Sequence, residues 1–274
     1  MMELDGAVAV VTGAAYGIGR ATAIALSAAG CDVVVVDIAD DQAQSTVAAI
    51  EESGGAAQFV HADVASRADM EAMASAAIEW RGHCDLLIAN AAISGTGAPH
   101  EFSADDWEHM LGVNLFGAIW AMRPLLPHMI ERDHGHLCFV SSGAGFIGIA
   151  HNAPYATTKF ALVGLAESLA IYLKESGVSV SLVAPGAVGG AHADTMRVAG
   201  AEHMSSDEVE AIKARQRDKM ATWPAPEGMA ALIVDGIRRG RYYIIQEGPG
   251  HEGWLSRTFR ERAEDPEAYL RRLT

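Results

Sequence analysis

Tyr155 and Lys159 are the residues whose types and spacing most directly suggest chemistry. They are four residues apart, so a helix would carry the phenol and the ammonium group on one face, and Pro154 suits the first turn of such a helix. A cation beside a tyrosine lowers the pKa of the phenol from about 10 toward neutral, which makes the phenol a better base for an alcohol proton. The pair therefore predicts a proton-transfer site in which Lys159 lowers the pKa of Tyr155.

Residues 12–19, with the sequence TGAAYGIG, form a second candidate site. The three glycines would let the backbone turn tightly and approach a pyrophosphate, whose negative charge is favoured at the N-terminus of the following helix. Their spacing is GxxxGxG, which differs from the commoner GxGxxG. Because the segment joins a predicted strand to a predicted helix, we interpret it as a nucleotide-binding loop.

Asp37 ends the second apolar run of the chain and follows Gly19 by 18 residues. A carboxylate at this position accepts hydrogen bonds from an adenosine ribose and repels the 2′-phosphate of NADP. No cation follows closely, and Tyr16 rather than a cation precedes Gly17. The sequence therefore favours NAD. The alternative that Asp37 only caps the next helix stays open, although Asp40 already suits that task.

These residues require a framework of alternating strands and helices, and the apolar pattern predicts one. Strands are expected at residues 7–12, 32–37, 57–61, 85–90, 136–141, 178–183 and 241–246. Helices are expected at residues 18–29, 40–52, 67–80, 154–175 and 225–239, with a long helix after Ser103 and another after Ser205, where the sequence resembles capping boxes. Strands that are apolar throughout are buried on both faces. We therefore predict the α/β class, with a doubly wound, parallel, seven-stranded sheet and helices on both faces.

The chain shows no linker, repeat or low-complexity segment, so residues 1–274 are predicted to form a single domain. Residues 186–223 interrupt the alternation and are expected to be a mobile loop beside the substrate, with Gly186, Gly189 and Gly190 as its hinge. Residues 250–274 form a charged C-terminal tail, which is expected to pack on a neighbouring subunit.

The composition limits the partners of the protein. There are 20 Lys and Arg against 35 Asp and Glu, which gives a formal charge of −15, and half of the residues are apolar. The acidic balance argues against nucleic acid as a partner, and no apolar run approaches the roughly 18 to 20 residues that cross a bilayer. No signal sequence is visible, so a cytoplasmic location is expected.

The cysteines and two histidines suggest structural roles. Cys31, Cys84 and Cys138 lack CxxC spacing and are expected to be reduced core residues. His134 and His136 have no third ligand at a useful spacing, so no metal site is expected. Both histidines are instead expected to cap the turn before the strand at 136–141.

The chain resembles the short-chain dehydrogenase/reductase family from about residue 5 to residue 250. Several motifs occur in the order and spacing of that family. They are residues 12–19, Asp63-Val64, Asn90-Ala91-Ala92, Asn114, Ser141-Ser142, Tyr155 with Lys159, and Pro185-Gly186. The resemblance implies a Rossmann-type fold, an NAD-dependent oxidoreductase, and a homotetramer assembled through the helices that begin near Ser103 and Pro154.

The resemblance also implies roles for the catalytic residues. Tyr155 is expected to be the catalytic acid and base, and Lys159 to bind the nicotinamide ribose. Ser142, 13 residues before the tyrosine, is expected to orient the substrate oxygen. Asn114 is expected to hold a water that links Lys159 to solvent.

The same resemblance implies a set of cofactor contacts. Asp63 and Val64 correspond to adenine contacts, Asn90 lies beside the adenosine ribose, and Val183 belongs to the nicotinamide wall. The residues expected to contact NAD are Gly13, Tyr16, Gly17, Ile18, Gly19, Asp37, Asp63, Val64, Asn90, Tyr155, Lys159, Pro185, Gly186 and Val188.

Two features depart from the family pattern. Residues 89–92 read Ala-Asn-Ala-Ala where the family often has Asn-Asn-Ala-Gly, a small change that should leave the strand end intact. Gly190 stands where a threonine usually holds the nicotinamide amide, which leaves that contact unassigned between Thr195 and a backbone group.

The substrate is predicted from three segments expected around the nicotinamide, residues 93–95, 143–152 and 188–204. They carry Phe146, Ile147, Ile149, Val188, Met196 and Met204, and Arg197 is their only Lys or Arg. An anionic substrate would need more positive charge. We therefore predict hydride transfer between NAD and a neutral, mostly apolar secondary alcohol, cyclic or aromatic in character.

Two alternatives to this function stay open. One is an NAD(P)H-dependent 3-oxoacyl reductase, which the acidic charge and Asp37 disfavour. The other is a non-catalytic nucleotide-binding regulator, which the presence of Ser142, Tyr155 and Lys159 disfavours.

Overall fold

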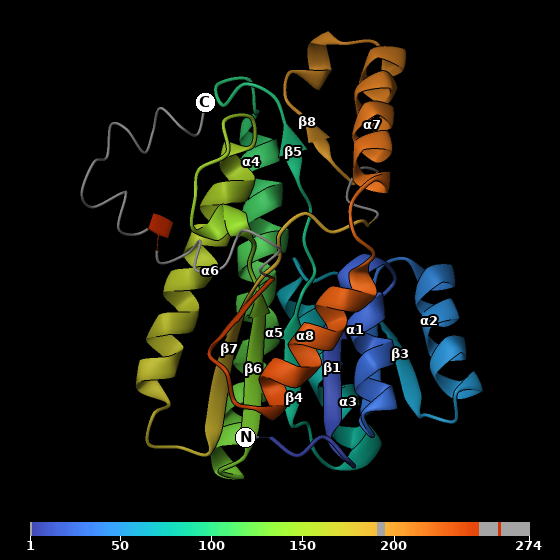
Figure 1. Cartoon of the computed structure of the whole chain (residues 1–274), viewed down its shortest axis with the longest axis vertical. Helices are drawn as coiled ribbons and strands as arrows, with labels where there is room; N and C mark the ends of the chain where they lie inside the picture. Colours follow the sequence, from blue (N-terminus) through green and yellow to red (C-terminus); the bar gives the residue numbers. More distant parts are fainter. Residues whose placement is uncertain (1, 191–194, 247–256, 259–274) are drawn as a thin grey trace.

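A computed structural model describes residues 2–190, 195–246 and 257–258 of the protein. In Figure 1 a central sheet carries helices on both sides. Its strands are β1 (Val8–Thr12), β2 (Asp32–Asp37), β3 (Ala57–His61), β4 (Leu86–Ala89), β6 (Gly135–Val140), β7 (Val178–Ala184) and β9 (Tyr243–Ile245). All neighbouring strands are parallel, in the order β3-β2-β1-β4-β6-β7-β9. The predicted seven-stranded parallel sheet of the α/β class is confirmed.

The central strands bury both of their faces, as their continuous apolar pattern predicts. Val8 and Val10 of β1 belong to the core on one face, while Ala9 and Val11 belong to the core on the other. The first core is covered by α3 (Arg67–Arg81), α5 (Gly117–Glu131) and α6 (Ala153–Tyr172), and the second by α1 (Gly17–Ala28), α2 (Asp40–Glu52) and α8 (Pro226–Arg238). Figure 1 shows α1 and α8 side by side across the front of the sheet.

The order of the strands reverses between β1 and β4. β2 and β3 lie on one side of β1, whereas β6, β7 and β9 lie beyond β4. Ligands of such sheets bind in the crevice at the carboxyl ends of the strands that flank the reversal. Residues 12–19 follow β1 and Asn90 follows β4. Two of the candidate segments therefore meet at this crevice.

The long helix predicted after Ser103 is confirmed, with a π-helical turn inside it. It consists of α4 (Ala104–Leu111), a π-helical turn η1 (Gly112–Phe116), and then α5. The capping boxes predicted at Ser103 and Ser205 are confirmed, and Ser205 is the N-cap of α7 (Ser206–Ala221). A single π turn inside a helix often marks a functional position.

A second, smaller sheet was not predicted. β5 (Gly95–Thr96) pairs in parallel with β8 (Arg197–Val198), and the Arg197 amide donates a hydrogen bond to the Ser94 carbonyl at 2.9 Å. The predicted loop 186–223 therefore contains β8, a short 3-10 turn at Ala201–His203, and α7. Apart from residues 257 and 258, the predicted tail at 250–274 lies outside the described residues. Within the described ranges, no helix combines the length and apolar character needed to span a membrane.

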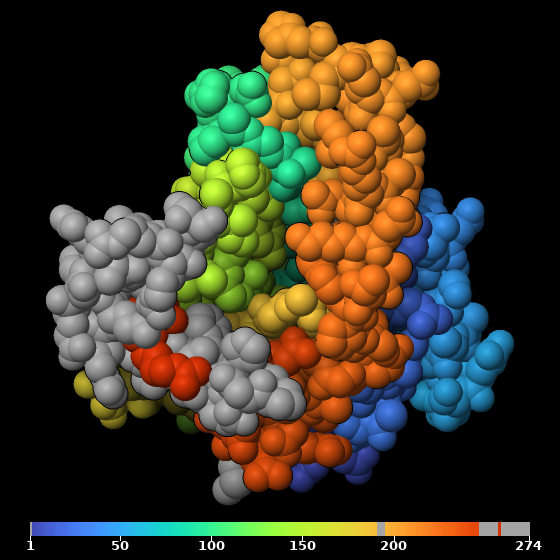
Figure 2. All heavy atoms as spheres, turned by 45° about the horizontal axis from the view of Figure 1, so that its top comes forward, coloured from blue at the N-terminus to red at the C-terminus, as the bar shows by residue number. Residues whose placement is uncertain are grey.

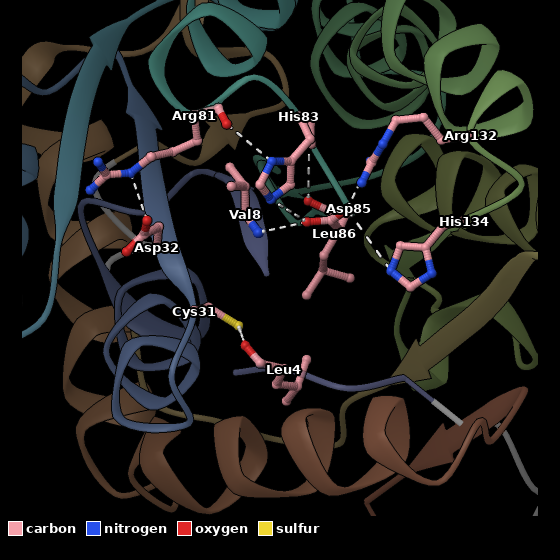
Figure 3. A network of polar contacts seen from close by, with 11 residues as sticks. Leu4, Val8, Cys31, Asp32, Arg81, His83, Asp85, Leu86, Arg132 and His134 are labelled. Atoms are coloured by element: carbon pink, nitrogen blue, oxygen red, sulfur yellow. Dashed lines mark hydrogen bonds and ion pairs between the residues drawn. The ribbon is translucent and has the colours of Figure 1, made fainter. Parts of the chain in front are cut away.

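A buried carboxylate ties several elements together at the edge of the sheet opposite the crevice. Asp85 immediately precedes β4, and its carboxylate accepts hydrogen bonds from the Val8 amide at 2.9 Å and from Arg132 at 2.8 Å. His83 lies 3.2 Å and His134 lies 3.9 Å from the same carboxylate. Figure 3 shows these groups converging on Asp85, so β1, β4 and the segment after α5 share one polar anchor.

The cysteines are free and buried, as predicted. Burial raises the pKa of Cys31 and Cys84 to about 12, so neither thiol ionises near neutral pH. Among the described residues, no group of three or more His, Cys, Asp or Glu side chains is arranged to hold a metal ion.

His136 lies inside β6 rather than in the turn before it, so the prediction for this histidine is wrong. Its Nδ1 lies 2.8 Å from the Ser179 hydroxyl and its Nε2 lies 2.9 Å from the Ser181 hydroxyl. Because Ser181 donates its hydrogen to the Arg241 carbonyl, Nε2 of His136 is the donor to Ser181. The two serines of β7 satisfy the neutral ring, and burial lowers its pKa to about 3.

The buried His136 predicts a loss of stability in acid. An unfolded histidine has a pKa of about 6.5, so only the unfolded chain takes up this proton between about pH 6.5 and 3. Neutral His136 therefore contributes to the free energy of unfolding above about pH 6.5. This contribution is lost as the pH falls, and the free energy of unfolding decreases by about 2 kcal/mol between about pH 7 and 5. Urea unfolding of wild type and His136→Gln at both pH values, at one protein concentration, measures this difference. His100→Gln, at an exposed position, is the control; a wild-type pH dependence in His136→Gln contradicts the assignment.

Candidate active site

Tyr155 and Lys159 lie in the first turns of α6, and Pro154 is among its first residues, as predicted. The side-chain nitrogen of Lys159 lies 5.5 Å from the centre of the Tyr155 ring. The same nitrogen donates a hydrogen bond to the carbonyl of Val140, the last residue of β6, at 2.9 Å. Lys159 is almost completely buried. The helix therefore brings the phenol and the ammonium group together at the carboxyl end of the sheet.

The pKa of Tyr155 is raised in this structure rather than lowered as predicted, and the effect of Lys159 on it stays a prediction. Burial raises the pKa of the Tyr155 phenol, and the hydrogen bond with Ser142 opposes part of that rise. Burial also lowers the pKa of Lys159 to about 7, so this side chain is only partly charged at neutral pH. A partly charged lysine stabilises a phenolate less than the fully charged cation that sequence reasoning assumes.

The two serines at the end of β6 have different environments. Ser141 is buried and donates its hydroxyl hydrogen to the Lys159 carbonyl at 2.9 Å. Ser142 accepts a hydrogen bond from the Ala144 amide at 3.1 Å, and its hydroxyl is hydrogen-bonded to Tyr155. The structure therefore brings Ser142 rather than Ser141 to the phenol, in agreement with the sequence spacing.

Asn114 lies in the π turn η1 and is buried. Its Oδ1 accepts a hydrogen bond from the Ile93 amide at 2.8 Å, and its Nδ2 donates to the Ile93 carbonyl at 2.9 Å and to the Thr158 hydroxyl at 3.1 Å. Both hydrogens of the Asn114 amide are therefore committed to protein atoms. The water expected to link Asn114 and Lys159 stays a prediction.

Two residues of this site were missed by sequence reasoning. Thr158 is fully buried and joins Asn114 to the catalytic helix, yet its neighbour Thr157 is exposed. Asn152 accepts a hydrogen bond from the Gly95 amide at 3.1 Å and so ties β5 to the start of α6. The position of Thr158 three residues after Tyr155, on the same face of the helix, was the only signal in the sequence.

The glycine loop fits a pyrophosphate. A Cβ on Gly19 would lie 2.0 Å from the Gly13 carbonyl oxygen, and one on Gly13 would lie 2.8 Å from the Ala91 Cα. Gly13 and Gly17 also adopt positive φ angles of 66° and 52°. Tyr16 precedes α1 without a side-chain cap, and the first turn of α1 has no acidic residue. The loop therefore needs glycine, and the start of α1, which includes Ile18, is suited to a negative group.

Asn90 braces this loop from the end of β4. Its Nδ2 donates hydrogen bonds to the carbonyls of Thr12 at 2.9 Å and Gly13 at 3.2 Å. The Thr12 hydroxyl in turn accepts hydrogen bonds from the amides of Asn90 at 3.0 Å and Ala91 at 3.2 Å. These bonds hold the ends of β1 and β4 together at the crevice.

Asp37 supports the start of the next helix, while its predicted contact with the ribose stays a prediction. Its Oδ2 accepts a hydrogen bond from the Ala15 amide of the glycine loop at 2.9 Å. Its Oδ1 accepts from the amides of Ile38 at 2.8 Å and Ala39 at 3.0 Å, just before α2. The carboxylate therefore lies against the loop, where a nucleotide ribose would be held, and also supports the start of the helix. Asp40 is not the N-cap of α2, since Ala39 occupies that position.

The two proposed adenine contacts differ in exposure. Asp63 is exposed and accepts a hydrogen bond from the Ala65 amide at 2.9 Å within its own turn. Val64 is buried, and a Cβ on Gly117 would lie 2.8 Å from one of its methyl groups. Both residues follow β3, so they lie at the same edge of the sheet as Asp37.

The segment after β7 lies beside the turn that carries the serines. The Pro185 carbonyl accepts a hydrogen bond from the Gly143 amide at 2.9 Å, and the Gly186 amide donates to the Gln246 side chain at 3.2 Å. Val188 is buried. A Cβ on Gly17 would lie 3.6 Å from the Gly190 Cα, so the start of the predicted substrate loop reaches the glycine loop.

Tyr155 packs against an apolar cluster from three separate segments. Its buried members are Ile93, Phe102, Met110 and Ala199, with Trp107 and Val113 packed against them. In Figure 2 the surface is hollowed between the orange segment that contains α7 and the yellow-green segment around residue 150. Phe146 does not line this region, contrary to prediction; it lies in the main core, where its ring contacts Tyr243 edge to face.

Arg197, the only cation predicted near the substrate, is directed to a carboxylate. Its guanidinium lies 3.7 Å from the carboxylate of Asp106 in α4. Both side chains line a cleft of about 330 Å³ between α4, β8 and α7, together with Lys213 and Glu202. The positive charge of Arg197 is therefore balanced within the protein.

The arrangement has known counterparts. Residues 7–199 match the family described as short chain dehydrogenase. The chain is 36% identical over 228 residues to cis-4-hydroxycyclohexanecarboxylate dehydrogenase from Sinomonas cyclohexanicum, covering 83% of this chain and 87% of that protein. It is 35% identical over 244 residues to the short-chain reductase protein NovJ from Streptomyces niveus, covering 88% and 90%. A short-chain dehydrogenase/reductase from Burkholderia phymatum, crystallised with NAD, has a TM-score of 0.85 at 29% identity and covers 98% of this chain and 96% of its own.

Proposed function

The chain belongs to the short-chain dehydrogenase family, and on that premise we propose that it oxidises a neutral, mostly apolar secondary alcohol, cyclic or aromatic in character, to the ketone. It is an oxidoreductase, and its cofactor is NAD. The prediction of an enzyme rather than a regulator is confirmed. The substrate is a proposal, and it is supported by the geometry around Tyr155.

The apolar cluster around Tyr155 carries the substrate proposal. A substrate hydroxyl that reaches the phenol brings the adjoining carbon groups against Ile93, Val113 and Ala199 or their neighbours. An unpaired carboxylate in such surroundings would lose its hydration without gaining a partner. Arg197 lies 3.7 Å from the Asp106 carboxylate, so an anionic substrate would compete with Asp106 for this guanidinium.

The chemistry that we propose for the chain uses four side chains. NAD supplies the hydride acceptor. Tyr155 takes the proton of the substrate hydroxyl, while Ser142, which is hydrogen-bonded to the phenol, holds the substrate oxygen within reach. Lys159 has a pKa of about 7, so it both holds and releases a proton near neutral pH, and it binds the nicotinamide ribose. Asn114 fixes the segment after β4 through Ile93.

We further propose that Gly186, Gly189 and Gly190 hinge the substrate loop. The Gly189 amide donates a hydrogen bond to the Pro224 carbonyl at 2.9 Å, so the two ends of the loop meet at its base. The pairing of β8 with β5 attaches the middle of the loop to the segment after β4. Movement of the loop would therefore open or close the side of the apolar cluster that contains Ala199.

A matched pair of cyclic alcohols tests the substrate proposal. 4-Methylcyclohexanol and cis-4-hydroxycyclohexanecarboxylate differ mainly in one carboxylate, and both are assayed with NAD by the absorbance of the reduced nicotinamide. We expect kcat/KM to be about tenfold or more higher for the neutral alcohol, because the carboxylate would lose hydration against the apolar cluster and would compete with Asp106 for Arg197.

Two results would contradict the proposal. A preference for the carboxylate that disappears in Arg197→Met would assign Arg197 to recognition of an acidic substrate. A preference for a 3-hydroxyacyl thioester over both ring alcohols would instead favour the 3-oxoacyl reductase.

We also propose that the enzyme is a cytoplasmic homotetramer. Support for assembly comes from exposed apolar side chains on the helices expected at the interface. Phe116 is 43% exposed before α5, while Ile171 and Tyr172, at the end of α6, are 71% and 74% exposed. Gly164 in the middle of α6 has open space around its Cα, which suits close approach of another helix.

A further inference from the structure

We propose that Thr158 is a positioning residue whose hydroxyl holds Asn114 and the first turn of the catalytic helix in one arrangement. The inference rests on the proposed role of Tyr155 as the catalytic base. Thr158 lies between Tyr155 and Lys159 in the sequence and has a role separate from theirs.

The contacts of Thr158 link three elements. Its hydroxyl donates a hydrogen bond to the Tyr155 carbonyl at 2.7 Å and accepts one from Nδ2 of Asn114 at 3.1 Å. Asn114 continues the chain of bonds to both backbone groups of Ile93, just after β4. Through one buried hydroxyl, the catalytic helix α6 is connected to the π turn η1 and to the segment that leads into β5.

The donors and acceptors of this chain allow only one orientation of the Asn114 amide. Because the Thr158 hydrogen goes to Tyr155, the hydroxyl oxygen is available only as an acceptor for Asn114. If the amide were turned over, its NH₂ group would face the Ile93 amide and its oxygen would face the Ile93 carbonyl. Both contacts would then be repulsive, so Thr158 and Ile93 together fix the amide.

The position of Asn114 affects the surroundings of Tyr155. Ile93, at one end of this hydrogen-bonded chain, and Val113, the residue before Asn114, pack in the same cluster as the Tyr155 ring. Removal of the hydroxyl would leave one hydrogen of the buried Asn114 amide without a partner, and the structure would have to shift to satisfy it. Such a shift moves the wall against which the phenol is held, and small displacements of a catalytic group lower the rate strongly.

Three substitutions separate the hydroxyl from the rest of the side chain. Thr158→Val removes the hydroxyl and keeps the shape, whereas Thr158→Ser keeps the hydroxyl and removes a methyl group. Thr157→Val is the matched control, because Thr157 is the preceding residue of the same helix and is exposed. Thr158→Ala, compared with Thr158→Ser, provides the same contrast if the valine variant does not fold.

The experiment measures kcat, KM for the alcohol, the dissociation constant for NAD, and the pH profile of kcat/KM. We expect Thr158→Val to lower kcat about tenfold or more and to displace the limb of the pH profile that reports Tyr155, with the NAD dissociation constant changed by less than about twofold. Thr158→Ser should recover kcat to within about threefold of wild type, and Thr157→Val should match wild type. A purely structural role would lower thermal stability without moving the pH profile.

Distinct results would overturn this inference and the proposed function. A kcat for Thr158→Val within about threefold of wild type would show that the hydroxyl does not position the site. Equal losses of kcat in Thr158→Ser and Thr158→Val would show the same. If Tyr155→Phe retains activity in parallel assays, the proposed function fails whatever Thr158 does. If Tyr155→Phe is inactive while Thr158→Val is normal, only the present inference fails.

Discussion

Replacing Tyr155 with phenylalanine is expected to lower kcat for alcohol oxidation by about a thousandfold, which is within the usual contribution of a positioned acid or base. The change removes only the phenolic oxygen, so the ring should still pack against the cluster of Ile93 and Met110. Binding of NAD should be retained, because the glycine loop and Asp37 remain intact. Turnover is followed by the absorbance of reduced nicotinamide, and NAD binding by calorimetry.

The pH dependence provides an independent check on the same residue. Since burial raises the pKa of Tyr155, the phenolate that accepts the alcohol proton becomes more populated as the pH rises. The value of kcat/KM for oxidation should therefore increase with pH through the neutral range, and the residual activity of Tyr155→Phe should lose this dependence. Tyr172→Phe, at the exposed end of the same helix, is the control. Retention of more than about a tenth of wild-type activity in Tyr155→Phe would assign the base elsewhere.

Asp37 is expected to set the preference for NAD over NADP, with kcat/KM for NAD about tenfold or more above that for NADP. Asp37→Ala should narrow the ratio, and addition of Ile38→Arg should narrow it further, because Ile38 is 61% exposed and has room for a guanidinium beside a 2′-phosphate. Steady-state kinetics with both cofactors provides the ratio for each variant.

The contacts of Asp37 call for a second variant. Asp37→Ala removes the acceptor for the Ala15 amide as well as the charge, so it also loosens the glycine loop. Asp37→Asn removes the charge and keeps one acceptor oxygen, and it should improve the use of NADP with a smaller loss of NAD efficiency. Asp41→Ala, on the exposed side of α2, is the control. Equal efficiency of wild type with the two cofactors would contradict the assignment.

The parts of the fold that were predictable are those set by local pattern. The strands at residues 32–37 and 57–61 and the helix at 40–52 match their predicted bounds, because continuous apolar runs and helical spacing are properties of adjacent residues. Ser103 and Ser205 likewise mark helix starts through residues only three positions away. The order of the sheet could not be read in this way, since strand neighbours such as β1 and β4 are far apart in the chain.

The features that sequence reasoning missed depend on tertiary contacts. The pairing of β5 with β8 joins two-residue strands about a hundred positions apart, and neither has a pattern of its own. The role of Thr158 depends on Asn114, which lies in a π turn of another helix and is far from Thr158 in the sequence. The direction of the pKa change at Tyr155 depends on how deeply the phenol itself is buried, which no spacing reveals.

The polar anchor at Asp85 has a consequence for engineering the enzyme. It holds Val8 and Arg132 at the amino edge of the sheet, whereas the residues proposed to choose the substrate lie beyond the carboxyl edge. Libraries that randomise residues 93–95 or 147–152 therefore leave these ties untouched. Substitutions that change the substrate preference can then accumulate while the scaffold keeps its stability. Because the two properties depend on different parts of the sheet, the protein is suited to directed evolution.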